Sequence, residues 1–290
     1  MSNNIALATQ YVALLDEVYK NASLTSVLDG NTDLVAQGAN ANELIIPKMT
    51  MDGLADYSRN GGYVGGDVTM SNETVTCNFD RGRMFSVDSM DDIETAGLAF
   101  GRLSSEFIRT KVVPELDAFR FAKYAGTIGI STASADLTTG EEVIAAISAA
   151  ADGMTNAGVP EENRILFITP THYGLVRDLD TTKSREILAS FSQIVKVPQS
   201  RFYSAIKQND GKTSGETAGG YVKAEGAVNI NFMIVEKSAT IQFEKHIAPK
   251  IVTPDQNQDA DAYKFGYRNV GIAEVYDNKV TGIYCHMATA

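Results

Sequence analysis

The chain has little cysteine, little basic charge and no long apolar run. Its two cysteines, Cys77 and Cys285, form no CxxC pair, which argues against a disulfide framework and a zinc ribbon. No run of about 18 apolar residues is present to span a bilayer, and the start of the chain lacks a basic region and a cleavage site. We therefore expect a soluble chain made inside the cell, with both cysteines reduced.

The charge balance is acidic, with 36 Asp and Glu residues against 25 Lys and Arg and a formal net charge of −11. Such a surface repels nucleic acid unless its basic groups are segregated. With 290 residues, 44% of them hydrophobic, the chain can form one large domain or two ordinary ones. The composition predicts a folded protein.

The first 25 residues have a helical pattern, with apolar residues at spacings of three and four: Leu7, Tyr11, Leu14, Leu15 and Val18. The stretch SLTSVLDGNTDLVAQGANAN that follows is rich in Ser, Thr, Asn, Asp and Gly. We interpret this stretch as an arm instead of a packed layer, and such an arm need not dock on the chain's own core.

Residues 43–88 are predicted to form a strand, a glycine-rich tip and a second strand. One side of the second strand is half apolar, and the opposite side is polar; the half-apolar side carries Val75, Cys77, Phe79, Arg81, Arg83 and Phe85. A two-stranded ribbon is marginal in water unless another surface covers it. Two interpretations stay open: a hairpin lying on its own domain, or an arm that reaches a neighbouring subunit.

A long helix is predicted after Ser89, a candidate N-cap with Asp92 in the capping-box position. An apolar stripe runs through it, and Pro114 lies further along the same pattern, where we expect a kink or break. Three arginines fall opposite the stripe, and a solvated mixed face is favoured over a surface for a polyanion: Arg102, Arg109 and Arg120.

Residues 131–243 are predicted to form a separate α/β unit. Thr139 and Glu142 form a capping box for a helix that ends at Gly158, and RILFITP is a buried strand followed by a helix from Pro170. The loop KQNDGKTSGETAGG has no apolar anchor, so we expect it to be mobile. The tail after residue 239 is strand-rich, with a polar loop at 254–260.

No catalytic, cofactor-binding or metal-binding residue is predicted. The GKT at 211–213 resembles the end of a phosphate-binding loop, but Ile206 stands where its first glycine is required. The stretch GGYVGG lacks the βα unit of a dinucleotide site. Three acidic residues lack the spacing of a calcium loop, so a solvated loop is favoured: Asp255, Asp259 and Asp261.

The histidines form no HxxxH or HExxH arrangement: His172, His246 and His286. His172 stands at a helix start and is most simply a capping or surface residue. Neither cysteine has a base beside it in the sequence. An isopeptide bond from Lys48 to a neighbour is a minor alternative.

The order of elements is more informative than any single motif: an arm, a glycine-tipped hairpin, an acid-capped long helix, an α/β unit and a strand-rich tail. This order resembles the major capsid protein fold of tailed bacteriophages, which encapsulin nanocompartments share. Four sequence segments support the resemblance: RGRMFSVDSMDDIETAG, ILFITPTHYGLV, IVKVPQSRFY and GYRNVGIAEVYDNKVTGIY. The resemblance covers essentially the whole chain, although none of these segments is diagnostic alone.

The resemblance implies an α+β fold in five parts. Residues 1–42 would be the N-terminal arm, 43–87 the extended hairpin loop and 88–129 the peripheral domain with its spine helix. Residues 130–243 would be the axial domain, and 244–290 would return largely to the peripheral sheet. The loop at 254–260 would cluster near local three-fold axes. The hairpin would pack on the next subunit, where Arg81 and Arg83 find partners that their own chain does not provide.

The implied function is that of a non-enzymatic major capsid protein, forming hexamers and pentamers in an icosahedral shell around double-stranded DNA. It would need no cofactor, metal or membrane, and would be assembled in the bacterial cytoplasm and found in the virion. Its partners would include a portal protein and a decoration protein. No charged scaffolding segment precedes the arm, so either that segment is removed or a separate scaffolding protein serves, and the start at Met1 favours the separate protein. The alternatives are an encapsulin-like shell around cargo enzymes and a soluble enzyme built on residues 131–243.

Overall fold

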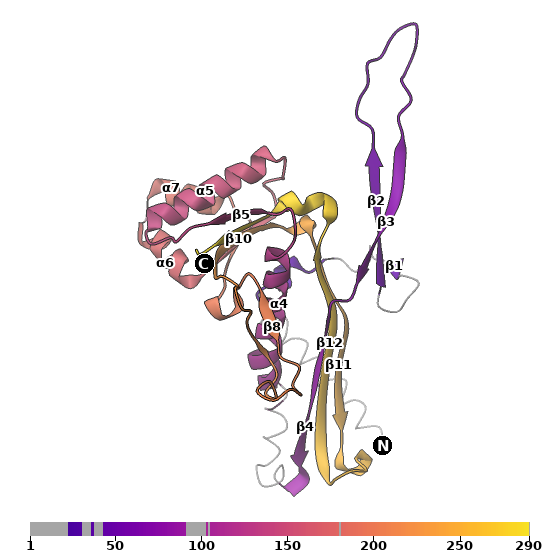
Figure 1. Cartoon of the computed structure of the whole chain (residues 1–290), viewed down its shortest axis with the longest axis vertical. Coiled ribbons are helices and arrows are strands. Elements are labelled where there is room, and N and C mark those ends of the chain that lie inside the picture. Colours follow the sequence, from indigo (N-terminus) through magenta and orange to yellow (C-terminus); the bar gives the residue numbers. More distant parts are fainter. Residues whose placement is uncertain are drawn as a thin grey trace.

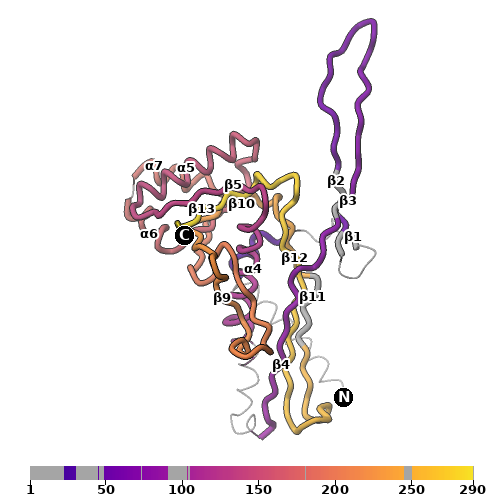
Figure 2. Tube along the Cα trace, viewed as in Figure 1, coloured from indigo at the N-terminus to yellow at the C-terminus, as the bar shows by residue number. Residues whose placement is uncertain are grey.

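The structure, a computed structural model, describes residues 23–30, 36–37, 43–90, 103, 105–179 and 181–289. It has an α/β body, a long antiparallel sheet beside it, and a hairpin that projects far beyond both (Figure 1). The trace in Figure 2 follows the chain from the hairpin down into the long sheet and then into the body. No helix in these ranges is long and apolar enough to cross a membrane.

The body is built on a five-stranded sheet in the order β5-β13-β10-β6-β7. Its strands are β5 (Ser131–Ser134), β6 (Arg164–Ile168), β7 (Gln193–Lys196), β10 (Ile230–Glu236) and β13 (Ile283–Met287). β10 is antiparallel to both β13 and β6, while β5 and β7 add parallel edges. Every residue of β6 and β10 is buried, as expected for central strands covered on both faces.

Three helices cover one face of this sheet: α5 (Gly140–Asn156), α6 (Pro170–Leu179) and α7 (Thr182–Ala189). The predicted capping box of α5 is confirmed, because Thr139 accepts from the Glu142 N–H and Glu142 accepts from the Thr139 N–H. The apolar stripe of α5, Val143, Ile147, Ala150 and Met154, is buried, and Gly158 follows the helix with a φ of 76°. The start of α6 at Pro170 is also confirmed.

Helix α4 (Val113–Ala125) covers the other face of the sheet, with Phe121 packed against Phe167 and Phe202. The expected break at Pro114 is replaced by a π-helical turn, η3 (Ile108–Val112), which runs directly into α4. Pro114 therefore lies in the first turn of α4, where a missing N–H donor costs little. The residues on either side of the turn keep right-handed helical dihedral angles.

The long sheet has the order β11-β12-β4, from strands β11 (Thr240–Val252), β12 (Ala262–Val275) and β4 (Phe79–Asp88). β4 pairs with β12 over its whole length, from Phe79 opposite Gly271 to Asp88 opposite Ala262. The expectation that residues 244–290 return to one sheet needs a correction. β11 and β12 form the long sheet, but β13 lies inside the five-stranded sheet of the body.

The projecting hairpin consists of β2 (Glu43–Met51) and β3 (Val68–Thr76), with the short β1 (Ala36–Gln37) paired to β2. Only two residues, Cys77 and Asn78, separate β3 from β4. The Asn78 amide replaces strand pairing there, donating to the carbonyl of Ala273 (2.8 Å) and accepting from its N–H (3.2 Å). The ribbon expected over 43–88 is thus two structures, a free hairpin and a strand of the long sheet.

The remaining elements are short. β8 (Ile206–Gln208) and β9 (Tyr221–Lys223) form a two-stranded sheet that carries the loop 209–220. The described residues also form five 3-10 turns: η1 (Ser26–Leu28), η4 (Gln199–Arg201), η5 (Lys237–Ala239), η6 (Pro254–Gln256) and η7 (Asp277–Gly282).

Candidate functional site: the projecting hairpin and its anchorage

The hairpin tip presents apolar side chains to solvent. Leu54 is fully exposed and Tyr63 is 91% exposed, and several further apolar residues along the hairpin are more than half exposed: Met51, Tyr57, Val64, Val68 and Met70. Figure 1 shows the tip standing clear of the rest of the chain. Soluble monomers rarely expose a contiguous apolar surface of this kind without an interaction that uses it.

The tip has local order of its own. Two backbone hydrogen bonds join Ser58 and Gly62, and the Gly61 N–H donates to the Ser58 hydroxyl (2.8 Å). The rings of Tyr57 and Tyr63 lie 4.9 Å apart. Gly62 has a φ of 76°, which a side chain would oppose. The tip is therefore a shaped apolar surface and not an extended strand.

The half-apolar face of β4 is turned onto its own chain, which corrects the expectation for both arginines. Arg81 pairs with Glu115 (2.8 Å) and donates to the carbonyl of Asn209 (2.7 Å). Arg83 donates to the carbonyls of Thr217 and Ala218, both at 3.1 Å. Neither arginine needs a neighbouring subunit for its hydrogen bonds. The same contacts give the loop 209–220 polar anchors, whereas its sequence predicts a mobile loop.

Aromatic packing completes this face. Phe79 lies 5.1 Å from Phe119 of α4, and Phe85 lies 4.8 Å from Phe107. Burial raises the pKa of Glu115, and the Arg81 guanidinium opposes that shift. β4 is thus held on the body both by aromatic contacts and by an ion pair that is largely sheltered from water.

A cavity of about 800 Å³ lies between β4, the helix before α4 and the loop 209–220. Three of the acidic groups along it are in ion pairs, Glu115 with Arg81, Glu106 with Arg109 and Asp80 with Arg268. The fourth, Asp210, accepts hydrogen bonds within its own loop. Such pairing stabilises the walls and leaves no convergent set of acid and base for catalysis among these residues.

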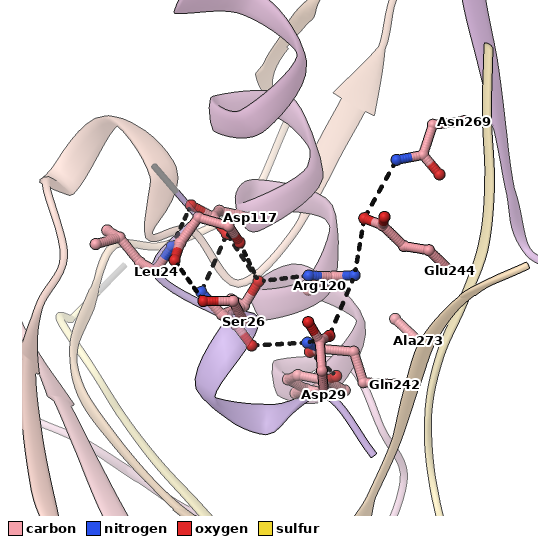
Figure 3. Close-up of polar contacts among 12 residues, drawn as sticks. Leu24, Ser26, Asp29, Asp117, Arg120, Gln242, Glu244, Asn269 and Ala273 are labelled. Atoms are coloured by element: carbon pink, nitrogen blue, oxygen red, sulfur yellow. Dashed lines mark hydrogen bonds and ion pairs between the residues drawn. The ribbon is translucent and has the colours of Figure 1, made fainter. Parts of the chain in front are cut away.

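A buried polar cluster, centred on Asp117 of α4, holds the segment 23–30 on the body (Figure 3). The Asp117 carboxylate accepts from the Ser23 hydroxyl (2.9 Å), from the Leu24 N–H (3.1 Å) and from both the N–H and the hydroxyl of Thr25 (3.2 and 2.7 Å). Arg201 balances its charge at 3.1 Å. The sequence left open whether this arm docks on its own chain, and residues 23–30 do so.

Arg120 extends the same cluster. It donates to the Thr25 hydroxyl (2.8 Å) and lies within ion-pair distance of Glu244 (3.5 Å) and Asp29 (3.7 Å). Its side chain is 1% exposed, so its expected place on a solvated face is wrong. Arg109 is exposed and pairs with Glu106, as a solvated face requires. Arg102 and Asp92 lie outside the described residues.

Leu28 and Gln242 secure the segment on its other side. Leu28 is fully buried in the main core, and the Gln242 amide donates to the carbonyl of Thr25 (2.7 Å) and to Asp29 (2.6 Å). Tyr124 in turn donates to Gln242 (2.7 Å). Burial raises the pKa of Tyr124, which remains a neutral hydrogen-bond donor.

Acidic residues in two polar loops, 209–220 and 254–260, accept local bonds. Asp210 accepts from the N–H groups of Lys212 and Thr213, and these bonds with the Thr213 hydroxyl lower its pKa to about 2. Asp259 pairs with Lys264 at 2.6 Å. Within the described ranges, no three His, Cys, Asp or Glu residues gather as metal ligands. The side chains of Lys48 and His246 lie outside what is described.

No family model and no curated protein matches the sequence. Solved structures do match over most of the chain. One from Gordonia phage Cozz has a TM-score of 0.62 at 13% identity, covering 92% of this chain and 87% of that one. The capsid structure of Staphylococcus phage Andhra has a TM-score of 0.58 at 10% identity, covering 91% and 83%. The chain has the phage capsid fold.

The same fold extends to a structure described as a virus-like particle from Pyrococcus furiosus. It has a TM-score of 0.58 at 13% identity, and the match covers 95% of this chain and 96% of that one. At these identities the likeness concerns the phage capsid fold itself, an α+β arrangement that the sequence predicted.

Proposed function

We propose that the chain is the major capsid protein of a tailed bacteriophage, which assembles into an icosahedral shell around double-stranded DNA. The observation that carries the proposal is the projecting hairpin, whose exposed apolar tip includes Leu54, Tyr57 and Tyr63. A subunit with such a tip becomes stable in water by placing it on another copy. The capsid fold supplies the architecture in which many copies do so together.

The contact is heterologous, because the hairpin of one copy meets a different surface of the next. Heterologous contacts that close generate rings, so hexamers and pentamers are the proposed units. In this assembly the hairpin of β2 and β3 is the extended loop, β4, β11 and β12 form the peripheral domain with residues 88–129, and 130–239 with β13 forms the axial domain. The loop 254–260 would meet its equivalents near local three-fold axes. A scaffolding protein, a portal protein and a decoration protein are the proposed partners in the host cytoplasm and virion.

A protein shell that encloses cargo enzymes is the second candidate. It is supported by the match to the virus-like particle, which covers nearly the whole of both chains. The contents of purified particles separate the two functions: double-stranded DNA supports the phage capsid, and a DNA-free protein cargo supports the compartment.

The test of assembly removes the tip but keeps the hairpin. Residues 53–66 are replaced by an Asn-Gly turn, since Asp52 and Asp67 already face each other across the two strands (2.8 Å from the Asp67 N–H to the Asp52 carboxylate). We expect a folded subunit that sediments as small species and shows no shells in negative-stain micrographs. A matched control is Ile128→Ser, which removes an equally exposed apolar side chain elsewhere. Normal particles from the tip variant would refute the proposed role of the hairpin.

A further inference from the structure

Two histidines lie together at one end of the five-stranded sheet, away from the hairpin. His286 belongs to β13 and is 3% exposed, with its ring stacked on Phe232 at 4.9 Å. His172 lies in the first turn of α6 and is half-buried. The polar groups around them come from β10 and from the stretch that follows β5, so four segments of the body meet here.

A β-bulge places Asn231 against His286. The pairing of β10 with β13 shifts register between Ile230 and Phe232, which leaves Asn231 as the extra residue. Bulges of this kind re-aim one side chain within a regular sheet. The Asn231 amide nitrogen donates to the carbonyl of Ala135 (3.0 Å) and lies 3.1 Å from Nδ1 of His286.

This geometry requires a neutral His286. An amide N–H group of Asn231 points at Nδ1 of His286, so Nδ1 has to be the acceptor of this hydrogen bond. A proton on Nδ1 would place two N–H donors against each other. Rotating the amide would place its oxygen against the carbonyl of Ala135, so the amide has no alternative orientation. The face of Phe232 attracts a cation, but it does not supply the acceptor that a second ring N–H needs.

His172 has hydrogen-bond partners of a different kind, because the hydroxyl of Thr169 can donate or accept. Its Nδ1 lies 2.5 Å from the hydroxyl of Thr169, a residue that is 2% exposed, and its ring also hydrogen-bonds the carbonyl of Leu137. It stands in the first turn of α6, where the helix dipole opposes a positive charge. Burial lowers the pKa of both histidines, and the neighbouring His172 lowers the pKa of His286 further.

The charged groups on the surrounding segments do not balance a positive charge on His172 or His286. Asp136, between the two backbone acceptors, is bonded to the N–H (3.1 Å) and hydroxyl (2.5 Å) of Thr289. On α6, Arg177 and Asp178 pair with each other in solvent. Other titratable groups on the packed elements include Tyr173 beneath Lys196, Tyr284 and the buried Cys285 on β13, and Glu236, which bonds Ser238 at the far end of β10. On α5, Glu142 accepts from the N–H groups of Thr138 and Thr139. β5 has no titratable group.

We propose that His172, His286 and Asn231 form an acid-sensitive latch, which holds β13 and α6 on the sheet at neutral pH and loosens them in mildly acidic solution. A proton on His286 breaks its bond to Asn231, and a second proton on His172 adds a like charge beside it. The last strand of the body, with the Thr289 contact that follows it, is the segment released.

The direction of the pH effect follows from linkage. Both histidines have folded-state pKa values below the ordinary histidine value of about 6.5, so the unfolded chain takes up protons first as the pH falls. Stability is fully present above about pH 6.5 and is lost below it. Each histidine lowers the folding equilibrium constant by up to about 10-fold per pH unit in that range, and the pair by up to about 100-fold.

The experiment measures hydrogen exchange of the full-length chain at pH 7.5 and 5.5, corrected for the intrinsic rate. Peptides covering β13 and residues 131–137 should lose protection at pH 5.5, before the α4 peptides do. The double variant His172→Gln/His286→Gln should remove that acid response, and His246→Gln, a histidine on β11, should keep it. An unchanged response in the double variant, or none in the wild type, overturns the proposal. An NMR titration of the wild-type imidazoles decides the matter if the double variant does not fold: a His286 pKa at or above 6.5 also overturns it.

Discussion

Replacing Asp117 with alanine should strongly destabilise the chain, because this carboxylate is fully buried and joins three segments. The substitution leaves the Ser23, Leu24 and Thr25 donors without their acceptor, and it removes the counter-charge of Arg201. Breaking a buried ion pair by removing one partner costs about 3 to 5 kcal/mol. We expect a loss of about 4 kcal/mol in the free energy of unfolding, a large part of the 5 to 15 kcal/mol of an ordinary domain.

The assay is urea unfolding of the unassembled subunit, followed by circular dichroism. Asp117→Asn keeps one acceptor oxygen and the shape of the side chain, so its loss should be smaller than that of Asp117→Ala. Asp178→Ala is a matched control, since Asp178 also pairs with an arginine at 3.1 Å but is 71% exposed. It should change the free energy of unfolding by about 0.5 kcal/mol or less. Equal effects of Asp117→Ala and Asp178→Ala would refute the argument that the Asp117 cluster anchors residues 23–30.

Two further predictions concern packing and burial. In α5, a methyl group added at Gly140 would overlap the carbonyl of Leu175, whereas one added at Gly153 meets nothing within 4 Å. Gly140→Ala should therefore lower the free energy of unfolding by about 1 to 3 kcal/mol, and Gly153→Ala should raise it by about 0.5 to 1 kcal/mol. Thermal unfolding measures both changes. Melting temperatures that shift in the same direction in the two variants would contradict this packing. Burial raises the pKa of the Cys285 thiol to about 12, so a thiol reagent at pH 8 should modify only the partly buried Cys77 in the native chain and both cysteines in urea. Rapid native labelling of Cys285 would contradict its burial.

Local signals in the sequence were sufficient for the elements of the body. The capping box at Thr139, the apolar stripe of α5 and the Thr169-Pro170 junction are each specified within a few residues, and the structure has all three. The alternation along β3 and β4 was also interpreted correctly as strand. What alternation does not encode is the partner: it continues across Asn78, where pairing changes from β2 to β12, nearly 200 residues away.

The contacts of Arg81 and Arg83 were missed for a related reason. Most of their acceptors are backbone carbonyls of a distant loop. Every residue has a backbone carbonyl, so the sequence does not indicate which ones accept these hydrogen bonds. Asp117 and Arg120 did leave a signal, because they interrupt an otherwise apolar helical stretch, LDAFRFA. A charged pair on the buried side of a helix indicates a polar partner, and the hydroxyl-rich stretch that begins at Ser23 is that partner.

The two-residue junction at Asn78 makes the hairpin and the long sheet mechanically continuous. The hairpin is a lever arm, and a force on its tip produces a torque where β3 meets β4. That torque strains the two hydrogen bonds between the Asn78 amide and the backbone of Ala273. β4 then carries that load to Arg81 and Arg83, and through them to the loop 209–220 on the body. A molecule that binds the tip therefore also loads the loop 209–220, a surface that the tip does not touch.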